Sequence, residues 1–185
     1  MAPFPTYERY NTTAISWYPR IPAHWTMDRA KWSISSCING AWGSEPNGED
    51  DIICLRVADF DRTSLKINTE KLTTRSVHLN DREKRLLGLG DLLIEKSGGG
   101  EQQLVGAVVQ FDKTFEAVSS NFIARVVPNG SVVSRFLVYV HSHLYSGRVN
   151  LRSIKQTTGI QNLDTQSYFD EDIAYPPIRE QNADS

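Results

Sequence analysis

The sequence predicts an α+β domain, and three observations support this fold class. Of its 185 residues, 39% are hydrophobic, which is enough to form the core of one domain. Short apolar runs with strand character are interspersed with segments of helical spacing. Strands and helices do not follow each other in a regular β-α-β order, and no internal repeat occurs. This irregular mixture favours an α+β fold over a doubly wound parallel sheet.

Residues 1–24 are expected to form an arm. Four of the eight prolines lie here, together with the aromatic residues Tyr7, Tyr10, Trp17 and Tyr18. Because proline restricts itself and the residue before it to extended conformations, the arm should not be helical. Its aromatic side chains should dock it against the body of the protein or against a partner. The domain is assigned to residues 25–181, with a tail at 182–185.

The first half of the domain contains two candidate strands. Trp25–Ile38 is mixed and could hold one strand with its flanks, whereas Ile52–Val57 is a short, β-rich apolar run. Between them, Gly40–Asp51 is a stretch of Gly, Pro, Asn, Ser and acidic residues and should be a loop. Asp59–Lys71 is polar and turn-like.

A helix is predicted over Asn80–Leu87, with Asn80 as its N-cap and Glu83 as the capping partner. Gly88 and Gly90 should end it. Glycine-rich or charged turns then separate three strand candidates, which are Asp91–Glu95, Val105–Phe111 and Ala117–Val127.

The spacing becomes helical over Ser134–Tyr145, where Ser134 is the expected N-cap and Gly147 should stop the helix. An apolar stripe supports this helix and consists of Phe136, Leu137, Val140 and Leu144. Val149–Lys155 is expected to add one short helical turn. The next segment, Gly159–Asp164, has too few apolar residues for a helix or a strand and is interpreted as a polar loop.

The net charge is only −2, but the charges are strongly segregated. No acidic residue lies between Glu116 and Asp164, and five basic residues give this interval a local charge of +5. From Asp164 onward, six acidic residues oppose only Arg179, which gives −5. Segregation of this kind says more about partners than about the fold. The alternative is that the two patches of opposite sign meet each other in the folded protein.

Three residues of the basic interval, Arg148, Arg152 and Lys155, are spaced i, i+4 and i+7. A helix here would project all three from one face. With Arg135 and no nearby carboxylate, this face suits the phosphates of DNA, which supply affinity and orientation but no sequence information. The alternative is a solvated helix face that pairs with the acidic tail.

Amide side chains follow directly, at Gln156, Gln161 and Asn162. Amides can pair bidentately with adenine, so these residues are candidates for reading base edges. Asn121, on the last of the three strand candidates, is a further expected contact.

A second candidate site lies at Gly90–Gly100, where a short buried strand leads Lys96 and Ser97 into three glycines. Because glycine permits positive φ, backbone N–H groups here could point at a phosphate. No G-K-[ST] follows the glycines, so this is not a Walker loop. A flexible hairpin connection is the other interpretation.

Catalytic chemistry is not predicted. Glu95 and Lys96 are adjacent, without the spacer that metal nucleases place between acid and lysine, and His141 and His143 would face different sides of a helix. No Ser/His/Asp or Cys/His arrangement can be assigned. We therefore expect no catalytic residue, no metal site and no cofactor; a small metal-dependent nuclease is the remaining enzymatic alternative.

The two cysteines, Cys37 and Cys54, lack the spacing of a zinc site, so free thiols in a reducing cytoplasm are expected. No apolar stretch is long enough to span a bilayer, and the N-terminus lacks the features of a secretory signal. A cytoplasmic location without a membrane partner follows.

Five segments carry a family resemblance, and they occur in a fixed order along residues 7–181. They are Tyr7–Trp25 with its Ile-Pro-Ala-His-Trp ending, Leu55–Asp61, Gly90–Gly100, Ala117–Val126, and Asn150–Phe169 with Tyr175–Gln181. Together they resemble the N-terminal half of a specificity subunit of type I restriction–modification systems. Each segment alone is a weak signal, and their order makes the match more specific.

This resemblance implies a twisted, largely antiparallel β-sheet with flanking helices, in a target-recognition domain that binds one half of a split DNA target. It implies a non-catalytic role, because separate modification subunits methylate adenine and a motor–nuclease subunit cleaves. The expected partners are double-stranded DNA and those modification and restriction subunits. The family's spacer helix would begin near Asn182, so a second half-subunit or a homodimer would be needed for a bipartite site.

The residues expected to contact DNA are Lys96, Ser97, Asn121, Arg148, Arg152, Lys155, Gln156, Gln161 and Asn162. The competing hypothesis is a subunit-interaction module, or a truncated specificity fragment, without DNA affinity of its own.

Overall fold

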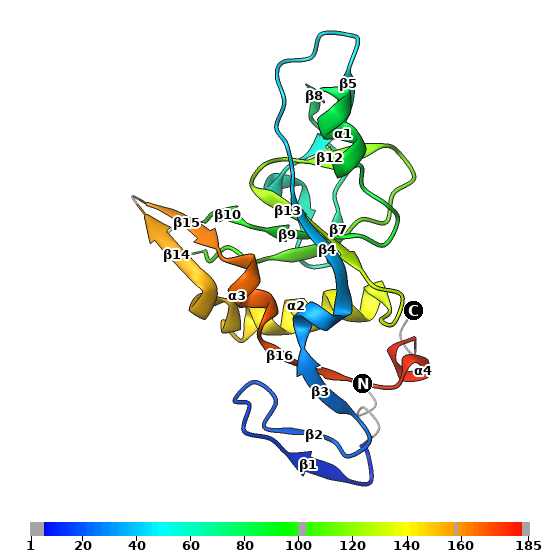
Figure 1. Cartoon of the computed structure of the whole chain (residues 1–185), viewed down its shortest axis with the longest axis vertical. Coiled ribbons are helices and arrows are strands. Elements are labelled where there is room, and N and C mark those ends of the chain that lie inside the picture. The colour runs from blue at the N-terminus through cyan, green and yellow to red at the C-terminus, as the bar shows by residue number, and fades with distance from the viewer. Residues whose placement is uncertain (1–5, 100–102, 158, 183–185) are drawn as a thin grey trace.

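The computed structural model describes residues 6–99, 103–157 and 159–182, and it shows a mixed α+β fold (Figure 1). The strands are β1 (Tyr10–Thr12), β2 (Arg20–Pro22), β3 (Thr26–Arg29), β4 (Ile34–Asn39), β5 (Asp51–Leu55), β6 (Phe60–Asp61), β7 (Lys66–Ile67), β8 (Thr74–Ser76), β9 (Leu92–Glu95), β10 (Ser97–Gly98), β11 (Val108–Gln110), β12 (Ala117–Ser119), β13 (Ile123–Pro128), β14 (Ile154–Thr157), β15 (Ile160–Leu163) and β16 (Asp172–Tyr175). The α-helices are α1 (Leu79–Arg85), α2 (Ser134–Ser146), α3 (Thr165–Phe169) and α4 (Ile178–Gln181), and the 3-10 helices are η1 (Ala30–Ser33), η2 (Val57–Asp59) and η3 (Val149–Ser153).

The strands form several small sheets rather than one large sheet. The central sheet has the order β11-β9-β13-β4, and two three-stranded sheets, β12-β5-β8 and β10-β15-β14, flank it. Among the pairings of the described residues, only β12 with β5 is parallel. The α+β class with largely antiparallel strands, expected from the sequence and the resemblance, is confirmed.

Strand β9 of the central sheet is buried on both faces, which places the core around it. Leu92 and Ile94 pack with the buried face of α2, whereas Leu93 points to a second cluster beneath β5, β7 and β11. Alternation along a strand sends neighbouring side chains to opposite faces, so an unbroken apolar run such as Leu92–Ile94 fits a strand covered on both sides. α2 runs below this sheet in Figure 1.

The predicted helices form, but both of their predicted N-caps are wrong. The N-cap of α1 is His78, whose ring nitrogen accepts a hydrogen bond from the Asn80 amide at 3.4 Å. The N-cap of α2 is Val133, which has no side-chain oxygen to offer, and Ser134 is the first helical residue. The α2 stripe is confirmed, with Leu137, Val140 and Leu144 buried and Phe136 half-buried. Gly147 is the C-cap of α2.

Two predicted segments have different structures. Ala117–Val127 is not one strand, because a turn at 121–122 divides it into β12 and β13, which lie in different sheets. The prediction of a polar loop at Gly159–Asp164 is also wrong, because residues 160–163 form strand β15 between β10 and β14. A strand needs backbone partners rather than apolar side chains, and here two neighbouring strands supply them.

The arm is not helical; its described part contains the β1–β2 hairpin, and aromatic side chains dock it on the body. Trp17 Nε1 donates to the Asp172 carbonyl at 3.0 Å, and the Tyr18 ring lies 5.2 Å from the His143 ring. Three further groups of the arm and its exit converge on the Glu180 carboxylate of α4: Tyr7 Oη, His24 Nε2 and Trp25 Nε1, at 3.1, 2.8 and 3.1 Å. The expected docking of the arm is confirmed.

Candidate nucleic-acid interface

The sheet β10-β15-β14 brings together the two candidate sites that lie far apart in the sequence. Ser97 on β10 is opposite Asn162 on β15, and Asn162 is opposite Lys155 on β14. Residues directly opposite in neighbouring strands project from the same face of a sheet. Ser97, Asn162 and Lys155 therefore form one row across three strands, called the polar row below. The β14–β15 hairpin projects from the body at the left of Figure 1.

A hydrogen bond orients the amide in this row. Ser97 Oγ donates to Asn162 Oδ1 at 2.7 Å, so the amide oxygen is engaged and the NH₂ group is turned toward other acceptors. An oriented NH₂ group suits the acceptors on purine edges, such as N7.

Lys155 ends the row on the edge strand. Its ammonium lies 2.7 Å from Asp164 Oδ2, and its side chain is 76% exposed. The ammonium holds the pKa of Asp164 below its usual value. Asp164 is also the N-cap of α3, where Oδ1 accepts from the Ser167 amide at 3.2 Å. A phosphate that binds Lys155 would therefore compete with an exposed carboxylate.

The two glutamines lie on the opposite face of this sheet from the polar row. Gln156 pairs with Gln161, one residue out of phase with Lys155 and Asn162. Gln156 is exposed, but Gln161 is buried, and its Oε1 accepts from the Val105 amide at 3.1 Å. Gln161 therefore has a structural role here, and the predicted set of adjacent amides does not share one surface.

The predicted helical face of Arg148, Arg152 and Lys155 is wrong. Arg148 has a left-handed conformation (φ 56°) and precedes η3, which contains Arg152, whereas Lys155 belongs to β14. The Arg148 side chain is exposed, and no ion pair is formed by Arg148 or Lys96 with any residue of the described ranges. Because the chain changes from the 3-10 helix η3 to the strand β14 between Arg152 and Lys155, the three basic side chains do not share one helical face.

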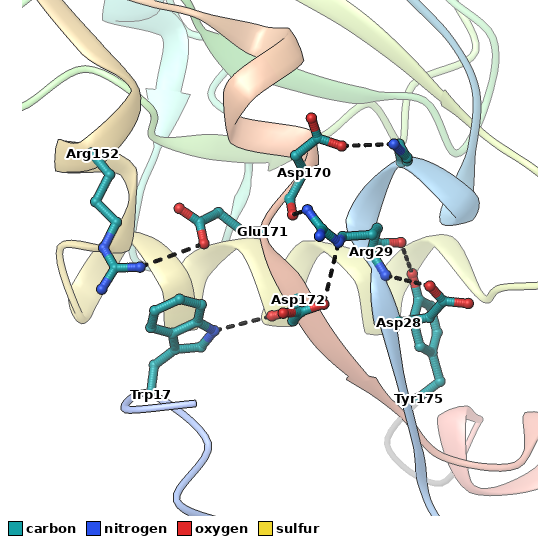
Figure 2. Close-up of polar contacts among 9 residues, drawn as sticks. Trp17, Asp28, Arg29, Arg152, Asp170, Glu171, Asp172 and Tyr175 are labelled. Carbon is teal, nitrogen blue, oxygen red and sulfur yellow. Dashed lines mark hydrogen bonds and ion pairs between the residues drawn. The ribbon is translucent and has the colours of Figure 1, made fainter. Parts of the chain in front are cut away.

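Acidic side chains from residue 164 onward form ion pairs with two basic residues of the 117–163 interval. This is what we expect if the two oppositely charged patches meet each other in the fold. The Arg152 guanidinium lies 4.8 Å from the Trp17 ring centre and 3.8 Å from Glu171 Oε2 (Figure 2). Lys155 pairs with Asp164 in the same way. Arg152 therefore links the arm to the start of β16, and this contact makes it less available to a phosphate than its sequence position suggests.

The neighbouring acidic residues have basic partners from another part of the chain. Asp170 is 2.7 Å from Lys31 Nζ, and its carbonyl accepts from Arg29 Nη1 at 2.7 Å. Arg29 Nε also lies 3.6 Å from Asp172 Oδ1. Figure 2 shows these side chains meeting where β3 and β16 run side by side, so the tail charge is largely balanced within the fold.

Lys96 and the turn that contains Asn121 lie next to the start of β10, which carries Ser97. The Phe122 carbonyl accepts from the Lys96 amide at 2.8 Å and from the Ser97 amide at 3.1 Å. These bonds hold the turn of Asn121 and Phe122 against the start of β10. Asn121 is exposed and Lys96 is half-buried. Gly98 and Gly99 have the positive φ expected of this loop, whereas Gly100 lies outside the described residues.

A buried ion pair supports this surface from below, and the sequence contains no local signal for it. Glu95 is buried, and its Oε2 lies 2.9 Å from Arg62 Nη2. Burial raises the pKa of Glu95, although the Arg62 guanidinium opposes this effect. Arg62 also donates to Tyr145 Oη at 3.0 Å. Arg62 and Glu95 are 33 positions apart, so only the fold could reveal their contact.

The described residues contain neither a candidate metal site nor a candidate membrane-spanning helix. No three His, Cys, Asp or Glu side chains there are grouped so that they could hold a metal ion. No helix of the described chain has the length and apolarity to cross a bilayer.

The fold is that of part of a type I restriction–modification specificity subunit. A chain from a structure of a type I R-M system, solved to explain complex assembly and conformational transition, matches with a TM-score of 0.55 and 18% identity over 87% of this chain and 36% of that one. The HsdS subunit from Thermoanaerobacter tengcongensis matches with a TM-score of 0.53 and 17% identity over 93% of this chain and 37% of its own. The type I S subunit from M. genitalium matches with a TM-score of 0.50 and 14% identity over 82% and 34%.

This chain therefore spans about a third of the length of the subunits that it matches, which corresponds to one target-recognition domain. The structural match to the family that the sequence resembles is confirmed over most of the chain. No protein-family model and no curated protein sequence matches it.

Proposed function

We propose that this domain recognises one half-site in double-stranded DNA, as the non-catalytic specificity component of a type I restriction–modification system. The observation that carries the proposal is the polar row, where an oriented amide (Asn162) stands between a hydroxyl (Ser97) and an exposed ammonium (Lys155). Such a row combines a group that can read a base edge with one that can hold a phosphate. The fold likeness supports the same assignment.

The proposed contacts differ in role. Lys96, Lys155 and Arg148 are assigned to phosphates, because each carries a positive charge and the side chains of Arg148 and Lys155 are exposed. Asn162 and Asn121 are assigned to base edges, with Ser97 orienting Asn162. Gln156 and Arg152 remain weaker candidates, and Gln161 is assigned a structural role.

Selection of bound duplexes from a randomised DNA pool tests the proposal. The wild-type chain should enrich a short motif, and Asn162→Ala should enrich it less strongly while retaining general affinity for DNA. Selection is run with and without candidate modification subunits. Enrichment only in their presence would mean that the domain recognises DNA as part of an assembly. Absence of enrichment under both conditions would contradict the proposal.

The non-catalytic assignment has its own test. Pure protein is incubated with plasmid DNA and Mg²⁺, and separately with S-adenosylmethionine and duplex DNA. We expect neither strand cleavage nor methyl transfer, because the assigned contacts bind DNA without grouping acid, base and nucleophile. Sustained cleavage by the pure chain would contradict this assignment.

A subunit-interaction module is the second candidate, and one surface favours it. Trp32 is 60% exposed beside a hollow of ≈ 400 Å³ that is also lined by Val132, Pro177 and Ile178. Exposed apolar surface of this kind often marks a protein interface. Trp32→Ala should weaken binding to a modification subunit, measured by sedimentation, and leave DNA binding intact. Loss of DNA binding instead would argue against a separate protein-binding surface.

A further inference from the structure

A second hollow, of ≈ 490 Å³, lies beside the polar row, and its size falls in the range of small-ligand sites. It is called the Phe122 hollow here. Its walls come from the β4–β5 loop, from the segment around η2 and from the turn between β12 and β13. Its lining includes Trp42, Arg56, Asn121 and Phe122.

Backbone hydrogen bonds hold these three segments together. The Ala41 amide, next to Trp42, donates to the Ser119 carbonyl at 2.8 Å. The Ser120 amide donates to the Leu55 carbonyl, next to Arg56, also at 2.8 Å. Because main-chain bonds rather than mobile side chains set these distances, the hollow is preorganised.

Two aromatic rings in the hollow are exposed. Trp42 is 36% exposed and Phe122 is 47% exposed, and neither belongs to the three hydrophobic clusters of the core. The Arg75 guanidinium lies 4.6 Å from the centre of the Trp42 ring, which fixes the orientation of that ring. Water-exposed rings that contribute nothing to the core are suited to stacking with a planar ligand.

The charges around the hollow are compensated, which argues against a phosphate as its occupant. Arg56 Nη2 lies 2.9 Å from Asp59 Oδ1 and 3.1 Å from the Lys71 carbonyl. Arg75 pairs with Glu45. The lining also contains the exposed side chain of Asn121, whose amide can both donate to and accept from the edge of a ligand. An uncharged planar heterocycle with donors and acceptors on its edge fits this lining.

A backbone contact joins the hollow to the start of β10, which carries Ser97. The Phe122 carbonyl that accepts from the Lys96 and Ser97 amides belongs to the same residue whose ring lines the hollow. A backbone held by Lys96 and Lys155 would therefore bring its bases next to Phe122. We propose that the Phe122 hollow receives one unstacked nucleobase of DNA bound on the polar row, stacked on Phe122 or Trp42 and contacted at its edge by Asn121. This inference rests on the proposed DNA recognition and extends it to a specific base pocket.

Duplexes that carry a single unpaired 2-aminopurine test the inference. One set moves this bulged base stepwise along the duplex, and the fully paired duplex is the reference. A base that is already unpaired enters a pocket without the cost of unstacking, so the bulge should bind more tightly at one position. We expect about tenfold tighter binding there, from the usual contribution of a base–aromatic stack, with quenched 2-aminopurine fluorescence.

Variants separate stacking from folding. Phe122→Ala and Trp42→Ala should remove most of the preference for the bulge and change affinity for the paired duplex less than about twofold. Phe122→Leu keeps an apolar side chain and should behave like Phe122→Ala if the ring is what matters. Tyr139→Ala removes an exposed aromatic side chain on α2, outside the hollow, so it is the matched control and should keep the preference.

Each outcome decides between the two levels of the proposal. If paired duplexes bind but no bulge position is preferred, the base pocket is wrong and DNA recognition stands. If no duplex binds with or without modification subunits, both are wrong. If Phe122→Ala and Trp42→Ala impair only the binding of a modification subunit, the hollow takes an aromatic side chain of a protein partner and the base pocket is refuted.

Discussion

The Ser97 hydroxyl donates a hydrogen bond of 2.7 Å to Asn162 Oδ1 across the β10–β15 pairing, and it thereby fixes which end of the amide faces outward. Ser97→Ala would leave Asn162 able to rotate, so the amide could present either its oxygen or its NH₂ group to a base. We expect sequence discrimination to fall by about fivefold or more, within the range of one base contact, while general DNA affinity changes little. Competition binding between selected and scrambled duplexes measures this effect.

Ser35→Ala is the matched control for this prediction, because Ser35 is an exposed serine on β4 outside the row. It should leave discrimination unchanged. Equal discrimination by Ser97→Ala and wild type would remove the orienting role of Ser97.

The ion pair between Lys155 and Asp164 predicts opposite effects for two substitutions. Lys155→Ala should weaken binding similarly on all sequences and flatten the dependence of log K on log [salt] by about one unit. Asp164→Asn keeps a side-chain acceptor at the N-cap of α3 but releases Lys155, so it should strengthen binding. Titration of labelled duplex at several salt concentrations measures both.

Lys84→Ala on α1 removes an exposed positive charge away from the hairpin and serves as the control (Figure 1). If it flattens the salt dependence as much as Lys155→Ala does, Lys155 has no special contact with phosphate.

His141 predicts a dependence of stability on pH. It is fully buried in α2, its Nδ1 lies 2.9 Å from Tyr168 Oη, and burial lowers its pKa from 6.5 to about 4. Between these pH values the unfolded chain binds more protons than the folded chain, so stability falls as pH falls through this window. The His141 contribution is fully present above about pH 6.5. The free energy of unfolding should fall by about 2 kcal/mol between pH 7 and pH 5 because of His141, since one pKa unit is worth about 1.4 kcal/mol.

Urea unfolding at the two pH values checks this prediction in wild type and in His141→Phe. The variant cannot protonate at this position, so its stability should fall by about 2 kcal/mol less over the same interval. His143→Gln replaces the exposed histidine of the same helix and should keep the wild-type pH dependence. If wild type and His141→Phe lose the same free energy of unfolding between pH 7 and pH 5, His141 does not cause the pH dependence.

Glu180 holds the arm against α4 through the hydrogen bonds from Tyr7, His24 and Trp25. Although burial raises the pKa of Glu180, these three bonds outweigh it and lower the pKa below its usual value. Glu180→Ala removes all three acceptor contacts, so the arm should open more often. Limited trypsin digestion should cut after Arg9 or Arg20 severalfold faster than in wild type.

Glu83→Ala removes an exposed glutamate of α1 and is the control for the arm. Similar digestion rates for Glu180→Ala and Glu83→Ala would show that the hydrogen bonds to Glu180 do not hold the arm.

Local sequence patterns correctly predicted the helices and strands whose conformation depends mainly on residues close in the sequence. The stripe of Leu137, Val140 and Leu144 identified α2, and Gly147 marked its end, because helical spacing depends on neighbours only three or four positions away. The apolar run at Ile52–Val57 identified β5 for a similar reason. The caps failed because His78 and Val133 are unusual residues at N-caps, where serine, threonine, aspartate and asparagine are preferred.

The candidate site was predicted as a set of residues but not as a surface. Lys155 and Asn162 were named from residue type and charge, and Ser97 from its glycine-rich neighbourhood. Their alignment in one row depends on the register of β10, β15 and β14, and a shift of one residue would have placed Gln156 and Gln161 there instead. Trp42, which lies in a stretch expected to be an ordinary loop, lines the proposed base pocket together with Asn121 and Phe122 only because the fold brings these segments together.

Composition and short-range periodicity were enough to predict the α+β class, the major helix, the core strands β5, β9 and β11, and the segregation of charge. Only the tertiary structure decided which charges are neutralised, as in Arg152 with Glu171, and which polar side chains share a face, as in Ser97 with Asn162. These relationships join residues between 19 and 65 positions apart. Strand pairing and packing set such distances, and no local pattern of residues encodes them.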